Sequence, residues 1–121
     1  MKKVFLAHAT SGDFRKNLYE PIRQSELSAF CELILPHETS DKQFDSKSFI
    51  ESDCDLIIAE VSEPSIGLGI ELGWANMYNK PVVCFYKVGS QVSESIRMVT
   101  NQIFEYSDGE DLIKKIKEVI K

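Results

Sequence analysis

The sequence predicts an α/β fold, a three-layer sandwich in which helices cover both faces of a five-stranded parallel sheet. The first observation behind this prediction is that short apolar runs alternate with amphipathic stretches along the whole chain. The second is that these runs are continuously apolar, whereas a strand exposed on one face would alternate polar and apolar residues. Such strands are buried on both faces, as in a parallel sheet that helices cover.

Five apolar runs have the length and composition of buried strands, and they occupy residues 4–7, 31–35, 55–61, 81–86 and 102–106. Parallel strands joined by helical crossovers favour the order 2-1-3-4-5 of flavodoxin-like and Rossmann-like sheets. In such sheets ligands bind beyond the carboxyl ends of the strands, near the switch between the first and third strands. A length of 121 residues suits one domain, so we expect residues 1–121 to form a single domain.

Stretches with helical character fill the intervals between these strands. They predict helices at residues 14–27, 45–52, 66–78, 92–99 and 109–121, with Pro21 kinking or interrupting the first. The last helix has the clearest period, because its apolar residues recur every three or four positions. These residues are Leu112, Ile113, Ile116, Val119 and Ile120.

Composition and charge exclude several classes of protein. No apolar run approaches the roughly 18 residues that span a bilayer, and the one behind the basic N-terminus is too short for a secretory signal. A formal net charge of −5, with no run of Lys or Arg longer than two, disfavours a nucleic-acid polymer as partner. The three widely spaced cysteines favour buried, reduced thiols in a cytoplasmic protein, and we expect neither a metal nor a cofactor.

The turn after the third strand carries the clearest chemical signal. Pro64 preorganises the turn, and Ser65 lies where its hydroxyl can cap the next helix. Gly67 and Gly69 would let a ligand approach the backbone, and the N–H groups of the helix start favour an anion. Glu71 follows within the first turns. These residues alone fit a solvated carboxylate beside a cap, a dinucleotide-binding turn, or a carboxylate nucleophile beside an anion site.

The stretch from residue 55 to residue 75 contains the string Ala-Glu-Val-x-x-Pro-Ser-x-Gly-x-Gly-x-Glu-Leu-Gly. It closely resembles the nucleoside 2-deoxyribosyltransferase superfamily, and within it the branch of 2'-deoxynucleoside 5'-monophosphate N-glycosidases. The likeness continues through residues 79–85 and stays in register at 18–20, 93–97 and the C-terminal helix. The resemblance implies hydrolysis of the base–sugar bond in 2'-deoxynucleoside 5'-monophosphates, with deoxyribosyl transfer to a second base as a side activity.

The resemblance also implies roles for individual residues. Glu71 matches the glutamate that attacks the anomeric carbon and forms a covalent glycosyl ester. Ser65 matches a serine that contacts the 5'-phosphate, and Ser93 matches one that reaches the phosphate from the neighbouring subunit, which implies a homodimer. The family's phosphate-gripping loop follows the first strand. In this chain its positions fall on His8 and Thr10, with Ser11 and Gly12 as further donors.

The sequence departs from the family pattern at the acid that assists the departing base. The family's aspartate falls on Lys47, and Asp45, two residues earlier, is the residue that could replace it. A family tyrosine in the first strand is Val4 here. These departures leave open a non-catalytic nucleotide-binding module on the same fold. Residues 4–11 also resemble the start of TIR-like domains, some of which cleave nicotinamide dinucleotide, so NAD hydrolysis is a further alternative.

Overall fold

The computed structural model describes residues 1–40 and 44–121. In these residues five strands form one parallel sheet in the order β2-β1-β3-β4-β5, which confirms the predicted fold class and strand order. The strands are β1 (Lys3–His8), β2 (Glu32–Ile34), β3 (Leu56–Glu60), β4 (Val82–Lys87) and β5 (Ile103–Tyr106).

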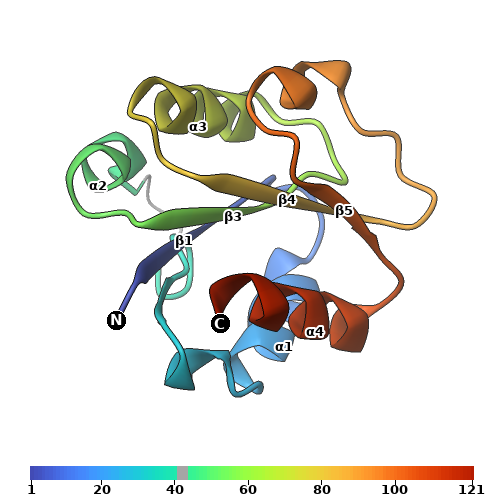
Figure 1. Cartoon of the computed structure of the whole chain (residues 1–121). Helices are drawn as coiled ribbons and strands as arrows, with labels where there is room; N and C mark the ends of the chain where they lie inside the picture. Colours follow the sequence, from blue (N-terminus) through green and yellow to red (C-terminus); the bar gives the residue numbers. More distant parts are fainter. Residues whose placement is uncertain (41–43) are drawn as a thin grey trace.

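Helices cover both faces of this sheet (Figure 1). On one face lie α2 (Ser46–Ser52) and α3 (Ile66–Met77), and on the other lie α1 (Glu20–Arg23) and α4 (Gly109–Ile120). Shorter helical turns complete the layers: η1 (Arg15–Tyr19), η2 (Leu27–Ala29) and η3 (Glu94–Met98). None of the helices in the described part of the chain has the length and apolar composition of a membrane span.

The predicted helix at residues 14–27 is interrupted, as Pro21 requires, and the structure divides it into η1, α1 and η2. Proline lacks an N–H group, and its ring clashes with the carbonyl group one turn earlier. The chain accommodates Pro21 by widening the preceding turn, so that the Glu20 N–H reaches back five residues to the Arg15 carbonyl oxygen. This π-type turn ends on Tyr19, whose side chain is buried.

The core has two parts because successive side chains of a strand point to opposite faces of the sheet. Val4 and Leu6 of β1 pack toward α1 and α4, whereas Phe5 and Ala7 pack toward α2 and α3. By the same alternation His8 belongs to the α1 face. The three cysteines are buried and unpaired, as the sequence predicts. The predicted helix at 92–99 is only the short turn η3, which buries none of its residues fully.

Candidate functional site

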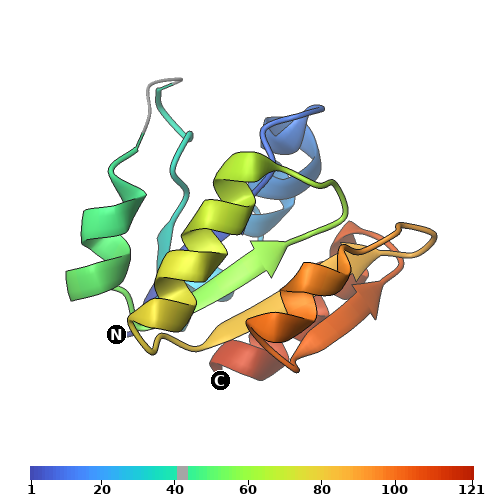
Figure 2. The same ribbon diagram turned by 90° about the horizontal axis from the view of Figure 1, so that it is seen from above.

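Apart from Ser93, the residues singled out in the sequence come from segments that meet at the carboxyl end of the sheet. Figure 2 shows the start of α3 and the loop that follows β1 at the same end of the molecule. The strand order places the switch between β1 and β3 at this end, where ligands bind in sheets of this type.

The start of α3 has the features of an anion-binding helix terminus. Ser65 is the N-cap, with an extended backbone, and its Oγ accepts a hydrogen bond from the Leu68 N–H at 3.4 Å. A Cβ atom at Gly67 would lie 4.0 Å from the Ser65 Oγ, and one at Gly69 would meet nothing within 4 Å. The two glycines therefore leave the first turn of α3 open to a ligand, while its first N–H groups have no acceptor within the helix.

Glu71 lies on α3, half-buried, and its carboxylate accepts a hydrogen bond from the hydroxyl of Ser46 at the start of α2. Ser46 is only 2% exposed. Burial raises the pKa of Glu71 above its ordinary value of 4.5, and the Ser46 hydrogen bond offsets part of that rise. A partly desolvated carboxylate with a fixed hydrogen-bond partner is the arrangement expected of a functional group.

The neighbours of Ser46 on α2 point elsewhere. The Asp45 carboxylate is exposed and caps α2 by accepting a hydrogen bond from the Ser48 N–H at 3.2 Å. Lys47 and Glu51 both interact with the hydroxyl of Tyr78, at the far end of α3. Ser46 is thus the α2 residue that touches Glu71, and the sequence did not single it out. The assistance of Asp45 to the departing base stays a prediction.

His8, at the end of β1, takes part in a buried hydrogen-bond network. Its Nδ1 lies 2.8 Å from the carbonyl oxygen of Ala9, and its Nε2 lies 2.7 Å from the Tyr19 hydroxyl. Since a carbonyl oxygen can only accept, Nδ1 carries the hydrogen, and Nε2 of the neutral ring accepts the hydroxyl hydrogen of Tyr19. Burial lowers the pKa of His8 below 6.5, which favours this neutral form. Both ring nitrogens of His8 are engaged within the protein.

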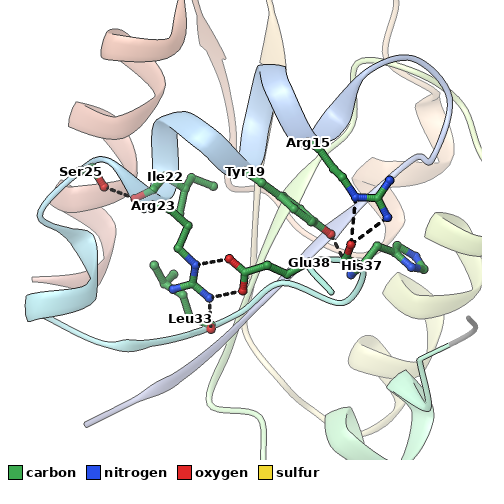
Figure 3. Close-up of polar contacts among 8 residues, drawn as sticks. All are labelled: Arg15, Tyr19, Ile22, Arg23, Ser25, Leu33, His37 and Glu38. Atoms are coloured by element: carbon green, nitrogen blue, oxygen red, sulfur yellow. Dashed lines mark hydrogen bonds and ion pairs between the residues drawn. The ribbon is translucent and has the colours of Figure 1, made fainter. Parts of the chain in front are cut away.

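The segment after β2 is fastened to η1 and α1 by three side chains (Figure 3). The Tyr19 hydroxyl accepts a hydrogen bond from the His37 N–H at 3.1 Å, and the Arg15 guanidinium donates two to the His37 carbonyl oxygen. Arg23 holds Glu38 through two hydrogen bonds of 2.6 and 2.7 Å. The rings of His8, Phe14 and His37 lie 4.8–6.1 Å apart beside this segment.

The loop after β1 is exposed at Thr10, Ser11 and Gly12. Gly12 has a φ of +70°, a conformation that glycine adopts without strain. Ser11 and Gly12 help to line a hollow of about 560 Å³ on the face that carries α1 and α4. Glu71 does not line this hollow.

Ser93 lies apart from this edge as the exposed N-cap of η3, where its Oγ accepts a hydrogen bond from the Ser95 N–H at 3.3 Å. Among the described residues, no three His, Cys, Asp or Glu side chains lie close enough together to share a metal ion.

Comparisons with known proteins identify the family. No family model matches the chain. A putative 2'-deoxynucleoside 5'-phosphate N-hydrolase 1 of Syntrophotalea carbinolica is 30% identical over 113 residues, which cover 84% of this chain and 79% of the relative. The chain belongs to the nucleoside 2-deoxyribosyltransferase-like family. This confirms the resemblance seen in residues 55–75.

Other members of the family show the same likeness. The 5-hydroxymethyl-dUMP N-hydrolases of Rattus norvegicus and Homo sapiens are 37% identical over 62 residues, or 46% of this chain. The match spans only 38% and 36% of those two proteins. A solved structure of a CMP N-glycosidase from Clostridium botulinum has a TM-score of 0.68 and 25% identity, over 96% of this chain and 99% of that one. A conserved Enterococcus faecalis V583 protein, 21% identical with a TM-score of 0.67 over 98% of this chain and 99% of that one, shares the fold.

The burial of Glu71 predicts that this carboxylate costs stability at neutral pH. The folded protein holds the Glu71 proton more tightly than the unfolded chain does, so the free energy of unfolding falls as the pH rises from about 4.5 through the raised pKa of Glu71. Glu71→Gln removes the charge and keeps an acceptor for Ser46. We expect the melting temperature at pH 7 to rise by a few degrees, whereas Glu118→Gln, at an exposed site on α4, should leave it unchanged. A melting temperature that stays the same or falls in Glu71→Gln would contradict this.

Proposed function

We propose that this protein is an N-glycosidase that hydrolyses the bond between base and sugar in 2'-deoxynucleoside 5'-monophosphates. The observation that carries the proposal is Glu71, a half-buried carboxylate hydrogen-bonded to Ser46, on a helix whose open N-terminus is capped by Ser65. Its support from the comparisons is that family members are named 2'-deoxynucleoside 5'-phosphate N-hydrolase and 5-hydroxymethyl-dUMP N-hydrolase.

In the proposed reaction Glu71 is the nucleophile. One carboxylate oxygen bonds to the anomeric carbon of the deoxyribose, and the carbon–nitrogen bond breaks with its electron pair leaving on the base. The base takes up a proton, for which Asp45 is the predicted source. Water then adds to the anomeric carbon as the bond from that carbon to the Glu71 oxygen breaks, which restores the carboxylate. The proton that the water loses returns to Asp45, and the sugar phosphate leaves. A second base in place of water would give deoxyribosyl transfer.

The substrate phosphate would bind at the start of α3. The Ser65 hydroxyl and the first N–H groups of the helix supply donors, and Gly67 and Gly69 leave room for the phosphate oxygens. Thr10, Ser11 and Gly12 are exposed in the loop after β1 and could add donors from the other side of the switch. His8, with both ring nitrogens engaged, would act through its neighbours rather than through a ring N–H on the phosphate.

A second candidate is a nucleotide-binding module without turnover. The observation that favours it is the direction of the α2 side chains, because Asp45 caps its own helix and Lys47 interacts with Tyr78. Such a module would bind deoxynucleotides at the start of α3 without releasing base.

Base release tests the proposed reaction. We expect the purified protein to liberate free base from at least one member of a panel of deoxynucleoside 5'-monophosphates that includes 5-hydroxymethyl-dUMP, measured by chromatography. Glu71→Ala should lower the rate by several orders of magnitude, and Glu118→Ala should leave it unchanged. Binding by calorimetry without base release would support the non-catalytic module. Nicotinamide release from NAD, run as a parallel assay, would instead support the TIR-like alternative.

Because the pKa of Glu71 is raised, the plot of activity against pH should fall on its acid side, here called the acid limb. A carboxylate nucleophile must be ionised, so kcat/KM should fall as the pH drops through a value above 4.5. Ser46→Ala removes the hydrogen bond that favours the ionised form, and we expect the limb to move to higher pH. Ser48→Ala, exposed on the same helix, is the matched control and should keep the wild-type limb. An unchanged limb in Ser46→Ala would show that Ser46 does not act on the reacting carboxylate.

We infer that the protein is a homodimer, with the outer face of α3 in the interface. Ile66, Ile70 and Met77 fall within one narrow stripe of this helix, and they are 85%, 47% and 62% exposed. The turn η3, which Ser93 caps, runs beside α3 in Figures 1 and 2, and Met98 in this turn is 82% exposed. An apolar stripe of this kind fits a second copy of the chain. A partner seated on it would bring Ser93 close to a neighbouring site.

The oligomeric state tests this inference. We expect light scattering after size exclusion to give twice the chain mass for the wild type and the chain mass for the double variant Ile70→Glu/Met77→Glu, because two added carboxylates per copy would be buried unpaired. Phe30→Glu, which adds a charge at a partly exposed apolar position on the opposite face, should leave the dimer intact. A monomeric wild type would overturn the inference.

A further inference from the structure

The Tyr19 hydroxyl joins three parts of the chain that are distant in sequence. It lies in η1, gives its hydrogen to His8 at the end of β1, and accepts the N–H hydrogen of His37 in the segment after β2. Tyr19 and His8 are 4% and 8% exposed, so water does not substitute for these contacts. The His8 ring, the Tyr19 hydroxyl and the His37 N–H all have hydrogen-bond partners only when His8 is neutral with its hydrogen on Nδ1.

The other fastenings of this segment are more exposed. The Arg23–Glu38 ion pair is more than one third exposed on both sides, and exposed pairs contribute little to stability. The Arg15 guanidinium, which donates to the His37 carbonyl oxygen, also belongs to an exposed side chain. Tyr19 therefore supplies the buried attachment of the segment 36–38.

The same hydroxyl lies within electrostatic reach of Glu71. Burial raises the pKa of Tyr19 to about 12, and the carboxylates of Glu38 and Glu71 add to the rise. Tyr19 thus stays un-ionised and keeps its hydrogen at neutral pH. The Tyr19 hydroxyl thus interacts with the segment after β2, with the neutral His8 and with Glu71.

We propose that Tyr19 is a positioning residue of this site: its hydroxyl, with the hydrogen held by neutral His8, fixes residues 36–38 against the end of β1, on the Glu71 side of the site. The role in catalysis rests on the proposed function, whereas the hydrogen-bonded pair itself does not. His8 then serves the site through Tyr19 without touching the substrate.

Protonation of His8 would break this arrangement. A second hydrogen on Nε2 would face the hydroxyl hydrogen of Tyr19, which would have to turn away while the oxygen accepts from both His8 and His37. Of the groups around the ring, His37 opposes the charge on His8 and Glu60 favours it. The charged groups that interact electrostatically with the Tyr19 hydroxyl are those of Arg15, Glu38 and Glu71. Burial has the largest effect and lowers the pKa of His8 from its ordinary value of 6.5, which favours the neutral ring.

Nuclear magnetic resonance tests the pair directly, because the chain has only two histidines. In the wild type we expect the ring nitrogen shifts of His8 to show the Nδ1–H form at pH 7 and a pKa below 6.5, with His37→Gln assigning the signals. Tyr19→Phe removes the hydrogen donated to Nε2, so the pKa of His8 should rise and the Nδ1–H form should lose its dominance. A hydrogen on Nε2 in the wild type, or an unchanged titration of His8 in Tyr19→Phe, would overturn the proposal.

Kinetics test the positioning role. On a deoxynucleoside monophosphate that the wild type hydrolyses, Tyr19→Phe should lower kcat/KM about tenfold, and its pH profile should no longer respond to the titration of His8, which acts on the site through Tyr19. Tyr78→Phe loses a hydroxyl at the far end of α3 and should match the wild type. Equal activity and equal limbs in Tyr19→Phe and wild type would refute the positioning role alone. A wild type that releases no base would refute the proposed function. The resonance experiment would still show whether the hydrogen bond between Tyr19 and His8 forms as described.

Discussion

The parallel pairing of β1 with β3 is the constraint on which the rest of this structure depends. Its register runs from Val4 opposite Leu56 to His8 opposite Glu60, so both strands end in the same row. Because β2 pairs with the other edge of β1, the chain leaves these strands in opposite directions, and the loops after β1 and β3 meet at the switch. The open start of α3 and the buried network of His8 are both consequences of this register.

At this end of the sheet, burial shifts the pKa values of two ionisable groups, Glu71 and His8. Burial raises the pKa of Glu71 and lowers the pKa of His8, so one group is harder to ionise and the other harder to protonate. Each has a hydroxyl partner: the Ser46 hydroxyl donates to Glu71, and the Tyr19 hydroxyl donates to His8. A hydroxyl can donate or accept without carrying charge, which suits it to both places.

Much of the fold could be predicted from the sequence because it rests on local patterns. The strands followed from continuous apolar runs, the break at Pro21 from the missing N–H group, and the Ser65 cap from the residue type before a helix. Ser46 and Tyr19 could not be found in this way, since each gains its place from a segment more than ten residues distant. No local pattern specifies which buried hydroxyl will face which carboxylate or imidazole.

The phase of α2 decides which of its residues lies beside Glu71. Positions one turn apart share a side of a helix, and on α2 Ser46 and Ile50 are buried whereas Lys47 and Glu51 are exposed. The position that carries the family's aspartate therefore lies on the outer side here, where Lys47 interacts with Tyr78. Asp45 could have been recognised as a cap from its place before the helix, which leaves Ser46 as the inward polar residue. A family resemblance aligns residue types by their position in the sequence, but the rotation of the helix decides which of these residues lies next to Glu71.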